Sequence, residues 1–427
     1  MDILLINAPV KRMSKHASLT PPLGLAYIAA ILIRAGYRVS AIDFNVSGFD
    51  PNRLKRALDR GNPAIIGIST HTETYPSGLE IAEIAKQVNP GVIVVMGGPH
   101  ATVMYQEVAK KRDIDVVVRG EGEYTMLELA DCFIRNKGGL AGIKGIAYKD
   151  NGMVKTTPDR HFIENPDELP FPSRGLFPLP LYDSSGSVLI SRGGCPFNCR
   201  FCSVNNIWKG RRRFRSPEKV LEEIIYIFKH GQAQGINFAD DTFTLNRERV
   251  IELCDLLEQS LKLQWMCSTR VDLVDRELLN KMHESGCYSV QYGIEAGSQK
   301  ILDSIGKRIT LKQIRNAVQT ALDVGIEITC SFMFPHPEDT KETIREQKQL
   351  MKELGEKGAM LLLSFTTPFP GTYYYEHADE LGIKIMADNW DEYDAKHLTI
   401  ATKHLSQEKL KSLLKELIEY VGLESST

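Results

Sequence analysis

No stretch of this sequence is apolar for long enough to cross a membrane. The longest apolar run, Gly24 to Ile33, is about half of the ~20 residues that a membrane-spanning helix needs. The first ten residues, MDILLINAPV, contain no basic segment before an apolar one and no small-residue cleavage site. We therefore expect a cytoplasmic protein that has no membrane partner.

An excess of charge of one sign is also missing. The 52 Lys and Arg residues nearly balance the 54 Asp and Glu residues, so the formal net charge is −2. A chain without a basic excess gives no sign of a nucleic-acid partner. The contents of 43% hydrophobic and 25% charged residues are typical of folded globular proteins and exclude a disordered or collagen-like chain.

Cysteine is scarce, but three of the eight cysteines are clustered. Cys195, Cys199 and Cys202 fall within eight residues, and in a reducing compartment such a cluster favours metal binding over a disulfide. The other five are scattered and are predicted to be buried core thiols: Cys132, Cys254, Cys267, Cys287 and Cys330.

The first 140 residues alternate short apolar runs with helical patterns. Near-continuous apolar strands between helices are typical of a parallel sheet that is covered on both faces. We therefore expect a doubly wound, Rossmann-like domain over residues 1–140. Its expected strands are residues 2–7, 38–44, 64–69, 92–96 and 115–119.

Residues 141–183 are expected to connect this domain to the next. They contain a predicted hairpin with its turn at Asn151-Gly152. Four prolines follow in residues 167–183, and because proline fixes φ and removes a donor, we expect an extended linker there.

The alternation of strands and helices resumes in residues 184–380. Its six β/α units favour a partial barrel over a closed eight-fold barrel. Residues 381–427 form a small C-terminal extension, which ends in an amphipathic helix predicted over 406–420. The fold class is therefore α/β, with two main domains and a helical tail.

The three clustered cysteines have the spacing C-x3-C-x2-C and come directly after the first expected barrel strand. Three thiolates on one loop can hold three irons of a four-iron cluster and leave the fourth iron open to a ligand. The alternative is a structural zinc site, which needs a fourth ligand such as His283 or Cys287.

The segment SRGGCPFNCRFCS resembles the radical S-adenosylmethionine (SAM) superfamily, and the resemblance covers about residues 185–400. It implies a partial (β/α)6 barrel with a 4Fe-4S cluster at its mouth, held by Cys195, Cys199 and Cys202. SAM would chelate the open iron. An electron from a low-potential donor would then cleave SAM to methionine and a 5′-deoxyadenosyl radical.

The same resemblance assigns roles to residues at other strand ends. Asp240 or Asp241 would contact the SAM ammonium, Ser268 its ribose and Arg270 its carboxylate, and Glu295 would bind its polar groups. Ionic side chains can equally form structural salt bridges, and that alternative stays open. The segment FMFPHPEDT, residues 332–340, departs from the glycine-rich family pattern and leaves contacts to adenine or substrate undetermined.

Two tyrosines are candidate catalytic residues. Tyr292 and Tyr373 are expected near the barrel mouth, where a phenol could position the substrate or donate a proton. The alternative is that both pack in the protein.

The strand ends of the first domain carry glycines and polar residues that could bind a ligand. The segments PPLGLAYIAAIL, GGPHAT and GEGE resemble the N-terminal domain of cobalamin-dependent (class B) radical SAM enzymes, whereas no G-x-G-x-x-G follows the first strand. The resemblance implies bound cobalamin, with His71 or His100 as a candidate axial ligand. The expected cofactor-binding residues are Pro9, Gly24, Ser69, Thr70, His71, Gly97, Gly98, His100, Gly120, Glu121, Gly122 and Glu123.

Both resemblances together imply a C-methyltransferase that acts through methylcobalamin and a 5′-deoxyadenosyl radical on an unactivated carbon. The expected substrate is a peptide or protein side chain, such as a glutamine of methyl-coenzyme M reductase. One alternative is a cobalamin-dependent radical SAM cyclase or rearrangement enzyme that acts on a small molecule. An alternative of another class is a non-catalytic cobalamin sensor or carrier, although a carrier does not need a three-cysteine loop.

Overall fold

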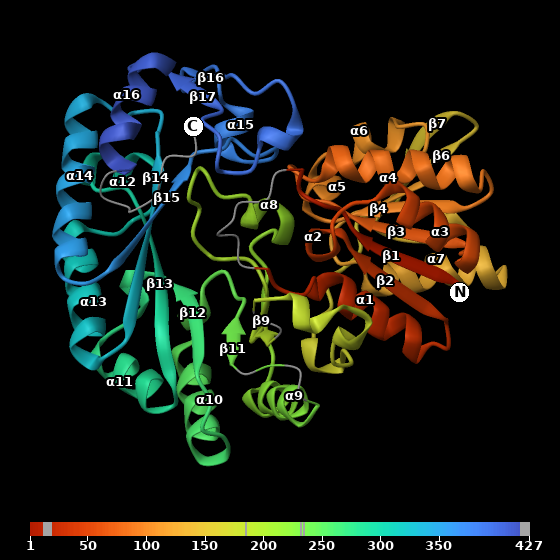
Figure 1. Ribbon diagram of the computed structural model, residues 1–427, viewed down its shortest axis with the longest axis horizontal. Helices are drawn as coiled ribbons and strands as arrows, with labels where there is room; N and C mark the ends of the chain where they lie inside the picture. The colour runs from red at the N-terminus through yellow and green to blue at the C-terminus, as the bar shows by residue number, and fades with distance from the viewer. Residues whose placement is uncertain (12–18, 184–185, 231–232, 234, 419–427) are drawn as a thin grey trace. The chain divides into compact units, whose positions relative to one another are not determined.

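The computed structural model describes residues 1–427 apart from 12–18, 184–185, 231–232, 234 and 419–427 (Figure 1). The chain divides into two compact units, residues 1–185 and residues 186–427. Among the described residues, no helix is both long enough and apolar enough to span a membrane.

The first unit is built on a seven-stranded sheet with the strand order β2-β1-β3-β4-β5-β6-β7. The first five strands pair in parallel, and the last two are added antiparallel. The expected parallel sheet is confirmed. The strands are β1 (Ile3–Asn7), β2 (Val39–Asp43), β3 (Ile65–Ser69), β4 (Ile93–Gly97), β5 (Val116–Val118), β6 (Ile146–Asp150) and β7 (Met153–Thr156).

Helices cover this sheet because its central strands are apolar on both faces. Ile3, Leu4, Leu5 and Ile6 of β1 are each at most 1% exposed, and helix α1 packs against α7 while α3 packs against α4. The helices are α1 (Leu23–Arg34), α2 (Phe44–Ser47), α3 (Pro51–Gly61), α4 (Tyr75–Val88), α5 (Pro99–Val103), α6 (Tyr105–Lys110) and α7 (Glu123–Arg135).

The strand order reverses at β1, which lies between β2 and β3. In a doubly wound sheet, ligands bind outside the carboxyl ends of the strands at such a switch point. The chain leaves β1 at Asn7 and β3 at Ser69, so the expected ligand-binding residues of these two loops lie at the switch point.

The segment 141–183 is packed onto the first unit. The predicted hairpin is present as β6 and β7, and it extends the sheet beyond β5. The expected extended linker is wrong, because three short 3-10 turns lie within residues 166–181, and Phe177 and Tyr182 are buried in the core of this unit. The turns are η2 (Pro166–Glu168), η3 (Arg174–Leu176) and η4 (Leu179–Leu181), and η1 (Leu140–Gly142) precedes the hairpin.

The second unit is built on six parallel strands in the order β15-β14-β13-β12-β11-β8. Because β8 and β15 are the two edges of this sheet, the barrel is open, as the six β/α units predicted. The strands are β8 (Ser187–Val188), β11 (Ile236–Phe238), β12 (Trp265–Thr269), β13 (Cys287–Glu295), β14 (Glu327–Phe334) and β15 (Met360–Phe365).

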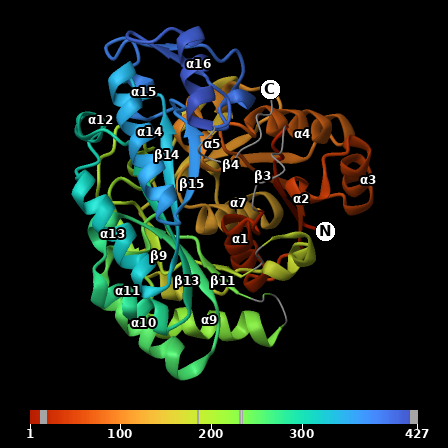
Figure 2. The same ribbon diagram turned by 60° about the vertical axis from the view of Figure 1, so that its left-hand side comes forward.

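Helices lie along one face of these strands, as Figures 1 and 2 show for α10, α11, α13 and α14. Side chains on this outer face, such as Trp265, Cys330 and Phe332, are fully buried, whereas alternate residues on the inner face are half-buried. The helices are α9 (Pro217–Lys229), α10 (Arg247–Ser260), α11 (Arg276–Glu284), α12 (Gln299–Ser304), α13 (Leu311–Val324) and α14 (Lys341–Glu356).

Short elements complete the second unit. An antiparallel pair, β9 (Ser191–Gly193) and β10 (Arg212–Phe214), brackets the cysteine segment and α8 (Val204–Trp208). The C-terminal part holds α15 (Tyr373–Glu376), the antiparallel pair β16 (Ile383–Ile385) and β17 (Ile400–Thr402), and α16 (Gln407–Ile418). The predicted C-terminal helix is confirmed up to 418, and its last two residues lie outside the described part.

Candidate functional site

Cys195, Cys199 and Cys202 lie on one loop, residues 194–203, which we call the cysteine loop. The three thiols are half-buried. Thr242 donates its hydroxyl to the Cys195 Sγ at 3.6 Å, and the backbone N–H of Val204 donates to the Cys202 Sγ. Donors aimed at sulfur stabilise thiolate ligands, so the loop fits the cysteine ligation of an iron–sulfur cluster.

Burial dominates the acid–base behaviour of these thiols. It raises the pKa of Cys199 above its ordinary value and that of Cys202 to about 12. The positive charges of Lys307 and Arg270 act on the Cys199 pKa in the opposite direction. Without a metal the two thiols are therefore protonated at neutral pH, and metal binding must release their protons.

The structure does not support the zinc alternative. In the part of the chain that the structure describes, no three His, Cys, Asp or Glu side chains converge as ligands of a single ion. Cys287 begins β13, and the His283 ring lies beside Gly325, just before β14, so both are at the amino ends of strands. The cysteine loop instead contacts Ile305, beyond the carboxyl end of β13. In an iron–sulfur cluster, each cysteine thiolate binds a separate iron.

The two aspartates after β11 have different surroundings. Asp240 is 4% exposed and accepts from the backbone N–H groups of Ile190 and Ser191 at 2.9 and 2.8 Å. Burial raises its pKa to about 6. Asp241 is exposed, and its carboxylate has no hydrogen-bond partner among the described residues. Of the two expected ammonium ligands, only Asp241 is available to a ligand.

Arg270, the expected ligand of the SAM carboxylate, makes internal contacts through its guanidinium group. It is 4% exposed and forms a bidentate ion pair with Asp272 at 2.9 and 3.0 Å. Its Nη2 also donates to the backbone oxygen of Lys307 at 2.8 Å, and its guanidinium lies 3.6 Å from the centre of the Phe197 ring. Ser268, on the inner face of β12, is half-buried and stays a candidate for the ribose.

Glu295 also has an internal partner, one that the sequence interpretation missed. Its Oε1 accepts from Lys307 Nζ at 2.9 Å, and Lys307 is 6% exposed. Glu295 has a φ of 70°, and a Cβ at Gly293 would lie 2.5 Å from its carboxylate. A side chain at position 293 would therefore displace the ion pair. The pairing of Lys307 with Glu295 depends on long-range packing, which no local pattern signals.

The divergent segment 332–340 places His336 inside the protein. The His336 ring is fully buried between the hydroxyl of Tyr374, 3.2 Å from Nδ1, and the backbone oxygen of Glu295, 3.3 Å from Nε2. Tyr374 in turn donates its backbone N–H to the Arg200 oxygen of the cysteine loop at 3.3 Å. Because its ring nitrogens face protein groups, His336 supports the loop and is not available to substrate.

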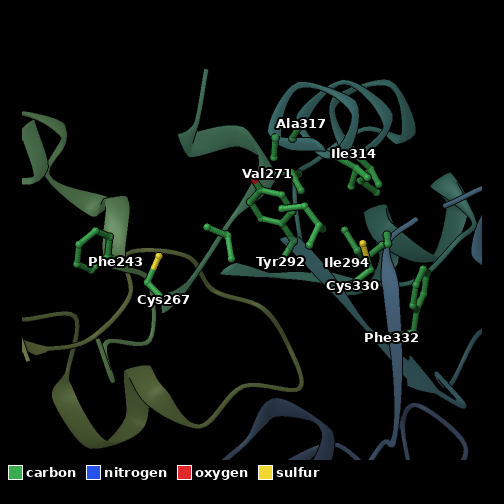
Figure 3. Close-up of a cluster of buried hydrophobic side chains, with 14 of the residues drawn as sticks. Phe243, Cys267, Val271, Tyr292, Ile294, Ile314, Ala317, Cys330 and Phe332 are labelled. Carbon is green, nitrogen blue, oxygen red and sulfur yellow. The ribbon is translucent and has the colours of Figure 1, made fainter. Parts of the chain in front are cut away.

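The two candidate catalytic tyrosines differ in position. Tyr373 is exposed, stacks on His377, and lies 5.0 Å from the Arg200 guanidinium of the cysteine loop. Tyr292 is fully buried on the outer face of the sheet, among the core residues that Figure 3 shows. The expected place of Tyr292 at the barrel mouth is therefore wrong. A phenol buried in the core cannot position the substrate or donate a proton to it.

In the first unit, the strand-end glycines serve two purposes. Gly98 has a φ of 97°, and a Cβ there would lie 2.5 Å from the Thr70 oxygen. An added Cβ at Gly122 would similarly lie 2.9 Å from the Ile28 side chain, so internal packing favours glycine at both positions. Gly24 and Gly120, by contrast, have no atom within 4 Å of an added Cβ and leave room for a ligand.

The two candidate histidines differ in how far their side chains are exposed. His100 is 2% exposed, stacks on Tyr75 and lies 3.3 Å from the Thr72 hydroxyl, and burial lowers its pKa to about 4. His71 follows β3 and is exposed. His71 is therefore the histidine that a ligand at the switch point could reach.

The remaining expected residues are mostly internal. Glu121 accepts from the backbone N–H of Ile163 at 2.7 Å, and Glu123, at the start of α7, is 2% exposed. Glu121 therefore has an internal partner, and Glu123 is buried. Pro9 and Thr70 are buried, whereas Ser69 and Gly97 are half-buried at the ends of β3 and β4.

Comparison with known proteins gives matches for both units. Residues 11–130 match the family described as B12 binding domain, and residues 189–351 match the Radical SAM superfamily. An uncharacterized methyltransferase of Pyrococcus horikoshii is 36% identical over 97% of this chain and 91% of its own length. An anaerobic magnesium-protoporphyrin IX monomethyl ester cyclase of Rubrivivax gelatinosus is 30% identical over 88% of this chain and 68% of its own.

Solved structures share the fold. The radical SAM methyltransferase TsrM of Kitasatospora setae, described with cobalamin and a [4Fe-4S] cluster bound, superposes with a TM-score of 0.78. The match covers 98% of this chain and 89% of that one at 17% identity, so it concerns the fold alone.

Proposed function

Because this chain belongs to the family of cobalamin-dependent radical SAM methyltransferases, we propose that it methylates an unactivated carbon of a peptide or protein side chain. The observation that carries the proposal is the cysteine loop, which presents three half-buried thiols beyond the carboxyl ends of parallel strands, beside the exposed Asp241. Electron delivery by a low-potential donor and a cytoplasmic location are parts of the same proposal.

The cofactors are a 4Fe-4S cluster, SAM and cobalamin, which together supply a reducing electron, a carbon-centred radical and a transferable methyl group. Cys195, Cys199 and Cys202 hold three irons, and the hydroxyl of Thr242 and the N–H of Val204 stabilise the sulfurs. Asp241 holds the ammonium of SAM, and Ser268 faces its ribose. In the first unit, His71, Gly24 and Gly120 form the part of the strand-end surface that accommodates cobalamin.

The inner face of the second sheet supports an amide-rich substrate. It carries half-buried amide and hydroxyl groups, and Gln291 donates to the Ser331 hydroxyl at 2.6 Å. Such groups can exchange their internal hydrogen bonds for bonds to peptide amides. A glutamine of methyl-coenzyme M reductase is one substrate of this chemistry. The polar residues of this face are Asn237, Ser268, Gln291, Ser331 and Ser364.

The test is an anaerobic reaction with the protein reconstituted with iron, sulfide and cobalamin. SAM with a deuterated methyl group is offered with a peptide library that includes the glutamine-containing segment of methyl-coenzyme M reductase. We expect mass spectrometry to show one labelled methyl group on a carbon of a peptide. Labelling of small molecules alone would contradict the peptide assignment.

A cyclase is the second candidate, because the Rubrivivax cyclase is 30% identical to this chain. Ring closure consumes SAM but adds no methyl group, so the product would carry no label. The non-catalytic alternative, a cobalamin carrier, predicts that the reduced and reconstituted protein leaves SAM intact.

A further inference from the structure

We propose that Arg270 is a positioning residue, which holds the cysteine loop in place and thereby retains the cluster. The inference deepens the proposed function, on which it rests for the presence of a cluster. It differs from the role that the family resemblance implies, in which this arginine binds the carboxylate of SAM.

Arg270 contacts both the cysteine loop and residues 305–307, the segment on which the loop rests. We call this segment the support. The Arg270 guanidinium lies 3.6 Å from the centre of the Phe197 ring, which belongs to the loop. Its Nη2 donates to the Lys307 oxygen at 2.8 Å, and Lys307 belongs to the segment that follows α12. Asp272 fixes the plane of the guanidinium by two further hydrogen bonds.

The loop rests directly on the segment that Arg270 holds. The Arg200 N–H donates to the Ile305 oxygen at 3.0 Å, and the Cys199 Sγ lies 4.0 Å from the Gly306 oxygen. The approach is close, because a Cβ on Gly306 would lie 3.3 Å from the Asn198 oxygen. A shift of residues 305–307 therefore moves Cys199 and its neighbours.

A second buried ion pair, between Lys307 and Glu295, holds the same segment. Lys307 Nζ lies 2.9 Å from Glu295, so one residue of the support is held by its side chain on Glu295 and by its backbone oxygen on Arg270. Both cations are at most 6% exposed. A buried pair that loses one partner leaves the other charge uncompensated, so each pair restricts the support strongly.

The geometry requires arginine. A planar guanidinium can stack on a ring, form a bidentate pair and donate to a carbonyl at the same time, whereas an ammonium on a flexible stem cannot. Arg270→Lys keeps the charge but loses the stack on Phe197. Phe197→Leu removes the same stack from the loop side, and because Phe197 is half-buried on a loop, this variant keeps the core intact.

The experiment measures iron release in the absence of SAM. Wild type, Arg270→Lys, Phe197→Leu and Phe197→Tyr are reconstituted with iron and sulfide, and the rate of iron loss to a ferrous chelator is recorded. The electron paramagnetic resonance spectrum of the reduced cluster is recorded beside it. Arg276→Lys, an exposed arginine of α11 that pairs with Asp323, is the matched control. Thermal unfolding checks that each variant is folded.

We expect Arg270→Lys and Phe197→Leu to lose iron about 10- to 100-fold faster than wild type, with a changed spectrum, as is usual when the supports of metal ligands are removed. Phe197→Tyr and Arg276→Lys should behave as wild type. Wild-type iron retention in both Arg270→Lys and Phe197→Leu, with weakened SAM binding in Arg270→Lys alone, would overturn the inference and restore the carboxylate role. Wild-type protein that assembles no cluster would overturn the proposed function as well, so the two failures are distinguishable.

Discussion

At the scale of single residues, two adjacent carboxylates at the end of β11 have separate tasks. Asp240 bonds the backbone of Ile190 and Ser191 and so fixes the chain just before the cysteine loop. Asp241 is exposed and has no such partner among the described residues, so it stays the candidate for a ligand. The sequence NFADDT cannot distinguish them, because the choice depends on which side chain meets the backbone of a distant segment.

The raised pKa of Asp240 predicts a specific pH dependence. Burial raises its pKa from 3.8 to about 6 in the folded chain, so the folded state binds the proton more tightly than the unfolded state does. The stability that this proton contributes is fully present below about pH 4 and is lost as the pH rises through about 6. Relative to Asp240→Asn, the wild-type free energy of unfolding should fall by about 2 kcal/mol between pH 4 and 7.

Urea unfolding of the metal-free proteins at a series of pH values measures this difference directly. The sign is the informative part, because an aspartate held by an ion pair would show the opposite trend. A difference in the free energy of unfolding between wild type and Asp240→Asn that does not change with pH would show that Asp240 has the same pKa in the folded and unfolded chains.

Asp241 predicts an effect on ligand binding and not on stability. Asp241→Asn should weaken SAM binding to the reconstituted protein about tenfold, because a hydrogen bond to a charged group is replaced by a neutral one. Equilibrium binding of SAM measures the change, and Glu248→Gln, on the neighbouring helix α10, serves as the control. Equal affinity in Asp241→Asn and wild type would remove Asp241 from the site.

At the scale of elements, the strands of both units follow from the sequence, and the loops between them do not. The strands are short, apolar and bounded by turn residues, so their positions are visible in the pattern. Which face a strand residue occupies depends on register, and a shift of one residue moves the side chain to the other face. Tyr292 was misplaced for this reason.

The segment 167–183 shows a second limit of sequence reasoning. Its prolines fix φ and indicate an extended chain, but they do not show whether the neighbouring aromatic residues find a core. Phe177 and Tyr182 do find one, and the Tyr182 hydroxyl donates to Asp43 at 2.8 Å. The three clustered cysteines, by contrast, could be predicted as metal ligands from the sequence, because all three lie on one loop.

The crossing of the two loops after β3 and β4 gives a prediction for a single element. Gly98→Ala should lower the free energy of unfolding by about 2 kcal/mol, because φ is positive and the added Cβ would meet the Thr70 backbone. Gly97→Ala is a matched control, since its Cβ would make only an ordinary contact with Val118 at 3.7 Å. Thermal unfolding of both variants measures the difference. Equal midpoints would contradict the close approach seen at Gly98.

At the scale of the whole molecule, two units of different topology contribute to one chemistry. The first unit has the strand order of a doubly wound sheet and matches the B12 binding domain, and the second is a partial barrel that matches the Radical SAM superfamily. The fold class and the cofactors could be predicted from short motifs, because each motif is local. The substrate could not, because the side chains that we propose to bind it come from several strands and form no local motif.

The central claim is that the three cysteines hold a cluster that cleaves SAM. Its most direct test is the analysis of SAM-derived products after anaerobic reduction of the reconstituted protein, compared with a variant in which Cys195, Cys199 and Cys202 are all alanine. We predict 5′-deoxyadenosine and methionine from the wild-type protein and neither from the variant. Intact SAM with the wild-type protein, or equal amounts of 5′-deoxyadenosine from both proteins, would contradict the account.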